Sequence, residues 1–294
     1  MDQALRNALL LLAPEYAARV ASLAKAEDIR LRCGSIPGYT VGGREYALAG
    51  APAVTEKAML YTLERASAAS LYAVQESLRR GYIHAFGGIR VGVCGTGVYR
   101  DGALSTIKDI SSVSIRIARQ CPGIADGLVP PKGTVPESTL LIGPPGSGKT
   151  SLLREMIRRI SDGGVRVSVC DTRGEIAAMH AGVSGFAVGQ CTDVLEGVEP
   201  REAVMMLLRT MTPQVVALDE ISEGEDARAV ELAANNGAAI LATVHGASCG
   251  DVFARPVLAR LLRRGVFRRA IVIRVEGGMR RYTCMELSGE AHAA

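Results

Sequence analysis

A short glycine-rich stretch, lying between a strand pattern and a helix pattern, constrains the fold of this chain more than any other feature. It reads Gly143-Pro-Pro-Gly-Ser-Gly-Lys-Thr150 and fits G-x-x-x-x-G-K-[ST] at every fixed position. An apolar run ending at Ile142 precedes it, and apolar residues at helical spacing follow from Ser151. A glycine loop between a strand and a helix N-terminus presents backbone N–H groups to phosphate oxygens. The sequence therefore predicts a P-loop that binds a nucleoside triphosphate.

The residue types within this loop predict separate roles. We expect Lys149 to reach the β- and γ-phosphates and the Thr150 hydroxyl to ligate Mg²⁺. No base-specific motif is visible, so the residues alone leave ATP and GTP both open. The predicted nucleotide-binding residues are Gly143, Pro144, Pro145, Gly146, Ser147, Gly148, Lys149 and Thr150.

Two stretches with different patterns of predicted helices and strands flank a segment rich in proline and glycine. Residues 1–120 mix helical patterns with strand-like pieces and glycine turns, which indicates a smaller α+β domain. Residues 121–137 hold seven of the proline and glycine residues and are predicted to be a linker. In the first domain we expect helices at 3–13, 15–26, 54–66 and 71–80, and strand-like pieces at 29–32, 39–48 and 112–117, with turns at Pro37-Gly38 and Gly42-Gly43. The glycine-rich segment 81–100 predicts a twisted antiparallel sheet.

Short strands alternate with helices in residues 138–294. This order is typical of a parallel sheet covered by helices on both faces, which is the usual setting of a P-loop. We therefore predict an α/β fold of the RecA/AAA-like P-loop NTPase type for this part. The expected strands are 138–142, 166–170, 215–218 and 239–243, and the expected helices are 149–161, 201–211 and 225–236.

Several strands of this part are followed by polar residues that suit hydrolysis of a triphosphate. Asp219 ends an apolar strand and is predicted to hold the Mg²⁺ shell, with Glu220 as the general base for an attacking water. His245 ends another strand at the same expected edge, where it would sense the γ-phosphate or hold water. Glu175 follows a third strand and would position water or support the metal. A surface turn with an Asp171–Arg173 contact is the alternative there.

Composition gives little support to several other functions. A net charge of +4 is too small to indicate nucleic-acid binding, and the arginine cluster 260–269 contains one aromatic residue, Phe267, where a surface for stacking bases would present several. The seven cysteines form no C-x-x-C pair, so we expect reduced thiols in a cytoplasmic protein. No apolar run approaches the roughly 20 residues that span a bilayer, and the N-terminus lacks a signal-peptide pattern. We expect no direct membrane insertion, so any membrane contact would run through partner proteins.

The chain resembles the stage III sporulation protein AA family, which is related to the ring ATPases of type II and type IV secretion. The resemblance covers roughly residues 28–287. Besides the P-loop, it is carried by the segments 70–73, 81–83, 87–93, 109–119, 171–176, 205–213, 219–221 and 242–246. The glycine-rich segment Gly87-Gly-Ile-Arg-Val-Gly-Val93 and the strand ending at His245 are more specific than the P-loop.

The resemblance implies an ATPase that uses Mg²⁺ and assembles into a homo-oligomeric ring, as a hexamer, with nucleotide between subunits. It implies a cytoplasmic location in the mother cell, peripheral to the membrane through sporulation channel proteins. In the secretion relatives, arginines of the N-terminal domain reach the phosphates, and Arg90 and Arg116 occupy the matching segments. The sequence departs from the family at Thr172, Gly174, Ser222, His84 and Ile89.

Three other functions are compatible with a P-loop. A nucleic-acid-associated ATPase is the main alternative, although no RNA-binding appendage follows the core in this sequence. A metabolic kinase would need an acceptor pocket and a lid, and the Asp219-Glu220 pair better suits attack by water. A regulatory scaffold would bind ATP without appreciable hydrolysis.

Overall fold

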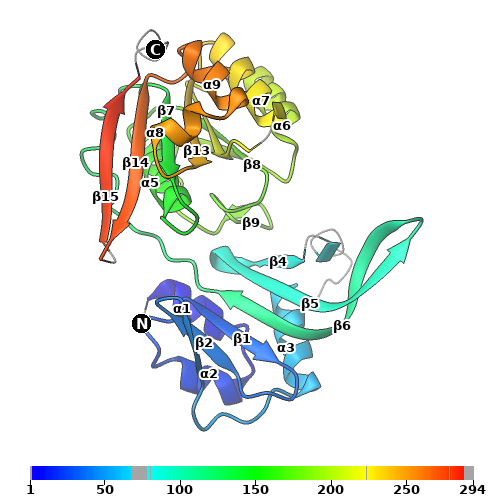
Figure 1. The fold of residues 1–294 in the computed structure, drawn as a ribbon. Helices are drawn as coiled ribbons and strands as arrows, with labels where there is room; N and C mark the ends of the chain where they lie inside the picture. Colours follow the sequence, from blue (N-terminus) through cyan, green and yellow to red (C-terminus); the bar gives the residue numbers. More distant parts are fainter. Residues whose placement is uncertain (1, 68–77, 80, 223, 278, 288–294) are drawn as a thin grey trace. The chain divides into compact units, whose positions relative to one another are not determined.

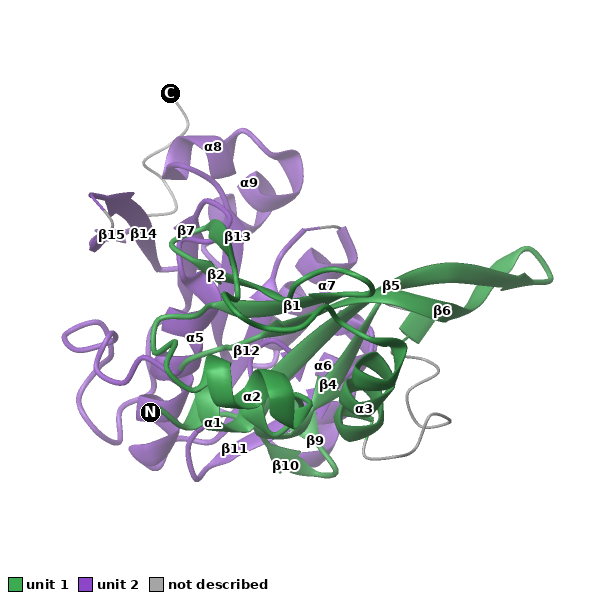
Figure 2. Ribbon diagram, turned by 90° about the horizontal axis from the view of Figure 1, so that it is seen from below, with its two compact units in different colours: residues 1–119, 178–186 green, residues 120–177, 187–294 purple. Residues whose placement is uncertain are grey.

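The structure is a computed structural model that describes residues 2–67, 78–79, 81–222, 224–277 and 279–287. It divides into two compact units (Figure 2). Unit 1 consists of residues 1–119 and 178–186, and unit 2 of residues 120–177 and 187–294. The chain therefore passes between the units three times, after Arg119, after Ala177 and after Phe186.

Unit 1 is built on a six-stranded sheet in which every pairing is antiparallel. The strand order is β3-β2-β1-β6-β5-β4, and three helices accompany the sheet in the described part of this unit. The apolar faces of strands and helices form one core. The elements are α1 (Gln3–Leu9), α2 (Pro14–Val20), β1 (Asp28–Arg32), β2 (Gly38–Val41), β3 (Arg44–Ala47), α3 (Glu56–Ala66), β4 (Tyr82–Ala85), β5 (Ile89–Arg100) and β6 (Ala103–Arg116).

The elements of unit 1 differ from the sequence prediction mainly in their ends. Helices α1 and α2 are shorter than expected, because the chain after each continues in tight turns such as Leu11 N–H to Ala8 O. The strand-like piece 39–48 forms a hairpin, and its predicted turn at Gly42-Gly43 is confirmed, with positive φ at both glycines. Strand β6 begins nine residues earlier than predicted and extends with β5 as a two-stranded ribbon (Figure 1). The predicted helix 71–80 lies almost entirely outside the described residues.

A short hairpin from the middle of the chain completes unit 1. It consists of β9 (Met179–His180) and β10 (Val183–Ser184), which pair antiparallel. The Phe186 ring at its end lies against Gly88, where an added Cβ would come within 2.6 Å of the ring. A glycine at position 88 therefore makes room for this contact. No sequence pattern predicted that this segment would leave the P-loop unit.

Unit 2 has a seven-stranded sheet in the order β11-β8-β12-β13-β7-β14-β15. All pairings are parallel except that of β14 with the edge strand β15. This mostly parallel α/β sheet confirms the predicted fold class. The strands are β7 (Thr139–Gly143), β8 (Val167–Asp171), β11 (Thr192–Glu196), β12 (Val215–Glu220), β13 (Ala239–His245), β14 (Arg269–Glu276) and β15 (Met279–Glu286).

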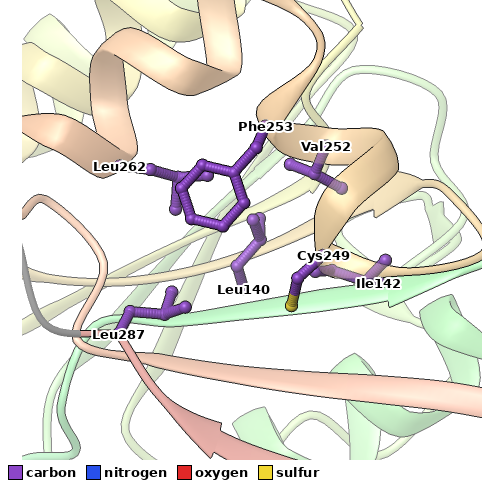
Figure 3. A pocket seen from close by; sticks show the side chains of 7 residues that line it. All are labelled: Leu140, Ile142, Cys249, Val252, Phe253, Leu262 and Leu287. Carbon is purple, nitrogen blue, oxygen red and sulfur yellow. The ribbon is translucent and has the colours of Figure 1, made fainter. Parts of the chain in front are cut away.

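Helices enclose the central strands of unit 2. Every residue of β7 and β8 is buried, as expected for strands covered on both faces. The helices are α5 (Lys149–Asp162), α6 (Pro200–Thr210), α7 (Gly224–Asn235), α8 (Cys249–Phe253) and α9 (Pro256–Arg263). An apolar hollow beneath α8 and α9 has no room for a water-sized molecule, so it is core packing (Figure 3). It is lined by Leu140, Ile142, Cys249, Val252, Phe253, Leu262 and Leu287.

The proline- and glycine-rich segment 121–137 forms no helix or strand and is attached to unit 2. The Gly123 N–H donates to the Glu155 carboxylate of α5 at 2.9 Å. The Leu128 carbonyl accepts from the Arg269 guanidinium of β14 at 2.7 Å, and Ala125 is fully buried. The passage from unit 1 to unit 2 thus lies at Arg119–Gln120, ahead of this whole segment.

Candidate active site

The loop between β7 and α5 has the backbone shape of a phosphate cradle. Gly146 and Gly148 adopt φ values of +74° and +94°, a region that side chains other than glycine rarely enter. A Cβ on Gly143 would come within 2.5 Å of the Ser147 hydroxyl. That hydroxyl is buried and has no hydrogen-bond partner among the described residues. The strict glycines and the unsatisfied hydroxyl fit a loop that receives phosphate oxygens.

Lys149 is held at the base of this loop. Its Nζ donates to the carbonyls of Gly143 at 2.9 Å and Pro144 at 3.1 Å, and lies 2.9 Å from Nδ1 of His245. Burial lowers the pKa of Lys149, and the nearby carboxylates of Glu220 and Asp219 oppose that shift. The ammonium therefore lies where β7, α5 and β13 meet, with acceptors that a phosphate group can replace.

The Thr150 hydroxyl of α5 meets the Asp219 carboxylate of β12, with Oγ1 to Oδ1 at 3.0 Å. Burial, reinforced by the charges of Glu175 and Asp171, raises the pKa of Asp219 to about 7. A cation at this point would relieve the cost of the buried charge. No group of three acidic, histidine or cysteine side chains in the described residues has metal-binding geometry. The Thr150 and Asp219 oxygens fit Mg²⁺, which takes one or two protein oxygens and fills its shell with phosphate and water.

Glu220 is held from both carboxylate oxygens. Oε1 lies 3.1 Å from Nε2 of His245, and Oε2 accepts from Nη1 of Arg173 at 3.3 Å. Because the Lys149 ammonium can only donate, Nδ1 of His245 accepts from it and Nε2 carries the proton. The neutral imidazole thus donates to Glu220 and connects the P-loop lysine with this carboxylate.

Water has access to Glu220 through a cavity of about 230 Å³. The cavity lies beside the carboxyl ends of β8 and β12 and the beginnings of α6 and α7. Arg173, Glu199, Asp219 and Glu220 are among the residues that line it. A carboxylate with water beside it has the surroundings that a general base for hydrolysis requires.

Glu175 lies on the turn that follows β8. Asp171 is fully buried and its carboxylate accepts from the backbone N–H groups of Glu175 and Ala177, each at 2.8 Å. The alternative considered from the sequence, a surface turn with an Asp171–Arg173 contact, is wrong. Asp171 is buried, and Arg173 contacts Glu220. The Glu175 charge helps to raise the pKa of Asp219, so the two carboxylates are within electrostatic reach.

Arg90 and Arg116 belong to unit 1. They are register partners on the antiparallel strands β5 and β6, and Arg116 also pairs with Asp28 of β1. The Arg90 guanidinium lies 3.9 Å above the Tyr82 ring. The structure therefore brings these two arginines together in one sheet.

Sequence reasoning missed two arginines next to the site. Nε of Arg280, on β15, donates to the Ser147 carbonyl of the P-loop at 2.9 Å. Arg154 of α5 is buried and donates to the backbone of the Glu175 turn. Neither has a local sequence signal, because Arg280 is 133 residues from Ser147 and Arg154 has the appearance of an ordinary helix residue.

The C-terminal arginine cluster does not lie on one helix. Arg260 and Arg264 form ion pairs with Glu231 of α7 at 3.2 and 3.1 Å. Arg269 lies in β14 and donates to the Leu128 carbonyl. Helix α9 ends at Arg263, and the ion pairs of Arg260 and Arg264 and the hydrogen bond of Arg269 all lie within unit 2.

Solved structures of two other proteins have a fold similar to that of this chain. The chain matches the pilus retraction motor PilT with a TM-score of 0.65 and 17% identity, covering 94% of this chain and 84% of that one. It matches the ATPase DotB of Yersinia pseudotuberculosis with a TM-score of 0.60 and 16% identity, covering 94% and 80%. At these identities the similarity establishes the fold. The fold and the glycine loop 143–150 together define this chain as a protein of the α/β P-loop NTPase class.

The sequence comparisons define the family. The model of the family described as "Sporulation stage III, protein AA" matches residues 12–285. The chain is 39% identical over 215 residues to Stage III sporulation protein AA of Bacillus subtilis (strain 168), covering 70% of this chain and 69% of that protein. This chain belongs to the sporulation stage III protein AA family. In the part of the chain that the structure describes, no helix has the length and apolar character that crossing a membrane requires.

Proposed function

We propose that this chain is a Mg²⁺-dependent ATPase that acts in sporulation. Family membership supports the role in sporulation, and the likeness to PilT and DotB supports the fold such an enzyme needs. The observation that carries the hydrolytic assignment is the contact chain from Lys149 through His245 to Glu220. These contacts connect Lys149, the proposed phosphate-binding residue, with Glu220, the carboxylate that lines the cavity.

The proposed roles follow from the contacts. Backbone N–H groups of residues 143–150 hold the phosphates, and Lys149 exchanges its carbonyl acceptors for phosphate oxygens. Mg²⁺, held through Thr150 and Asp219, would neutralise charge on the β- and γ-phosphates. Glu220 accepts a proton from the attacking water, while His245 keeps its carboxylate oriented. Glu175 supports the water or the metal shell from the neighbouring turn.

We further propose a homo-oligomeric ring in which Arg90 and Arg116 approach the nucleotide of a neighbouring subunit or of the same chain. Their guanidinium groups would neutralise charge on the transferred phosphoryl group. Hydrolysis would move unit 1 against unit 2 at the passages after Arg119, Ala177 and Phe186, and drive or regulate a membrane channel through partner proteins. The ring, the cytoplasmic mother-cell location and the channel come from the family resemblance.

Phosphate release from ATP tests this proposal. We expect Lys149→Ala to lose nucleotide binding, and Glu220→Gln to keep binding and lose turnover. Normal hydrolysis by both variants would refute the assignment of the site. Turnover that rises with particle mass, and is lost in Arg90→Ala or Arg116→Ala at unchanged mass, would support catalysis between subunits. Concentration-independent turnover by a monomer would refute the ring.

A further inference from the structure

The backbone of the turn that carries Glu175 is hydrogen-bonded on one side to a buried cation and on the other side to a buried anion. On one side, the Arg154 guanidinium donates through Nε to the Ile176 carbonyl at 2.6 Å and through Nη2 to the Glu175 carbonyl at 2.5 Å. On the other side, the Asp171 carboxylate accepts from the N–H groups of Glu175, Ile176 and Ala177 at 2.8–3.2 Å. Two successive carbonyls and three successive N–H groups are thus fixed by only two side chains.

Both charged groups are removed from solvent. Arg154 is 7% exposed and Asp171 is 0% exposed. Burial lowers the pKa of Arg154 to about 10, and the Asp171 charge is the largest influence that opposes this. Because unpaired buried charges are costly, each group stabilises the other and both depend on the turn for their hydrogen bonds. Such a pair tolerates little movement of the turn between them.

The helix that provides Arg154 also provides the phosphate and metal ligands. Arg154 lies four residues after Thr150 on α5, so both side chains lie on the same face of the helix. The Thr150 hydroxyl contacts Asp219 on this face, and the Arg154 guanidinium contacts the backbone of Glu175. One helix face therefore sets the position of the Glu175 turn relative to the proposed Mg²⁺ site.

We propose that Arg154 and Asp171 are positioning residues that hold Glu175 in its working geometry beside Asp219. This inference rests on the proposed ATPase function of the site. Both residues act through the backbone of residues 175–177. The same turn immediately precedes Ala178, where the chain leaves unit 2. We call Arg154, Asp171 and their hydrogen bonds to residues 175–177 the brace. The brace therefore also fixes the end of the segment that precedes the β9–β10 hairpin.

The matched variants are Arg154→Lys and Arg158→Lys. A lysine at position 154 keeps the positive charge but lacks the planar fork that reaches two carbonyls at once. Arg158 lies one turn further along α5 and pairs with Glu155 at 2.7 Å and Asp162 at 2.9 Å, away from the turn. We expect Arg154→Lys to lower kcat about 10- to 100-fold, as misplacement of a reacting group does, with KM within about 3-fold of wild type. Arg158→Lys should leave both constants unchanged.

Combination with Glu175→Gln separates positioning from general loss of structure. If Arg154 acts through Glu175, Arg154→Lys should have no further effect on kcat once Glu175 is glutamine. Effects that multiply in the double variant would overturn the proposal. A parallel fall in kcat and in nucleotide affinity of the folded variant would also overturn it, since a residue that acts only through Glu175 leaves nucleotide binding intact.

Hydrogen exchange tests the brace without reference to hydrolysis. We expect the amides of residues 175–177 to exchange at least about tenfold faster in Arg154→Lys, while the α5 amides keep their wild-type rates. Unchanged exchange at the turn would overturn the brace even in an active enzyme. An inactive wild-type protein with the expected exchange would overturn the ATPase proposal alone. If Arg154→Lys does not fold, Asp171→Asn provides the same comparison from the other side of the turn.

Discussion

Nε2 of His245 lies 3.1 Å from Oε1 of Glu220, while Nδ1 of the same ring lies 2.9 Å from Nζ of Lys149. A single imidazole thus joins the P-loop lysine to the proposed general base. If Lys149 turns to phosphate oxygens as proposed, Nδ1 of His245 would lose its donor, and the hydrogen bonding of Glu220 would change with it. Occupancy of the proposed phosphate site would in this way be linked to the carboxylate that would activate water.

Replacement of His245 tests this link. We expect His245→Ala to lower kcat about 10- to 100-fold with little change in nucleotide affinity, because Glu220 loses its orientation but the cradle stays intact. Arg173→Ala removes the contact to the other carboxylate oxygen of Glu220. Because the Arg173 side chain is 57% exposed, we expect this variant to lower kcat less than His245→Ala does. Steady-state kinetics with direct nucleotide titration distinguishes the two. A larger loss in Arg173→Ala would contradict the role assigned to the imidazole.

A methyl group on the P-loop should abolish nucleotide binding. Gly148 has φ of +94°, and an added Cβ would come within 2.7 Å of Nε of Arg280. Gly148→Ala therefore disturbs the loop as well as straining it by about 1–2 kcal/mol. The control is Gly164→Ala, at φ of +92° with open space around the Cβ, which carries the strain but lies away from the cradle. Equal nucleotide affinity in the two variants, measured by titration, would contradict the assigned cradle.

Arg280 should contribute to nucleotide binding, whereas its neighbour should not. Its Nε fixes the Ser147 carbonyl, so Arg280→Ala frees part of the P-loop and should weaken ATP binding about 5- to 20-fold, the equivalent of one hydrogen bond. Arg281→Ala removes an exposed partner of Glu276 and serves as the matched control. Titration with ATP and ADP compares them. An effect of similar size in Arg281→Ala would indicate a general change in charge at the β14–β15 hairpin.

The attachment of residues 121–137 should depend on pH through Glu155. The hydrogen bond from Arg158, together with that from the Gly123 N–H, lowers the pKa of Glu155 despite its burial. A lowered folded-state pKa stabilises the protein above the unfolded value of about 4.5, and this stability is lost as the pH falls through the folded value. Glu155→Gln should therefore cost about 1–3 kcal/mol at pH 7 and progressively less below pH 4.5.

Thermal unfolding of wild type and Glu155→Gln across pH measures this difference. Gln214→Ala, which loses one backbone contact at the start of β8 in the same unit, provides a variant without a titrating group. Its effect should not change between pH 7 and pH 4. A Glu155→Gln deficit that stays constant with pH would show that packing, and not charge, attaches the segment.

Much of unit 2 could be predicted because its signals are local. The P-loop and its flanking strand and helix occupy adjacent residues, so the glycines that permit positive φ are visible in the sequence. Asp219 and His245 each end an apolar run, and parallel strands bring such ends to one sheet edge. Strands β14 and β15 were not predicted, because they follow the arginine cluster and β15 is largely exposed, without the buried pattern of the other strands.

The sequence by itself determined the glycine loop between β7 and α5, the acids at the strand ends and the α/β class, because each depends on the conformation or burial of consecutive residues. Only the tertiary structure decided which side chains meet. Arg154 reaches carbonyls 21 and 22 residues away, and Arg280 reaches one 133 residues away. The segment 178–186 likewise joins unit 1 through contacts such as that of Phe186 with Gly88. These contacts depend on how the sheets and helices pack, and the free energy of that packing is shared among residues distant in the chain.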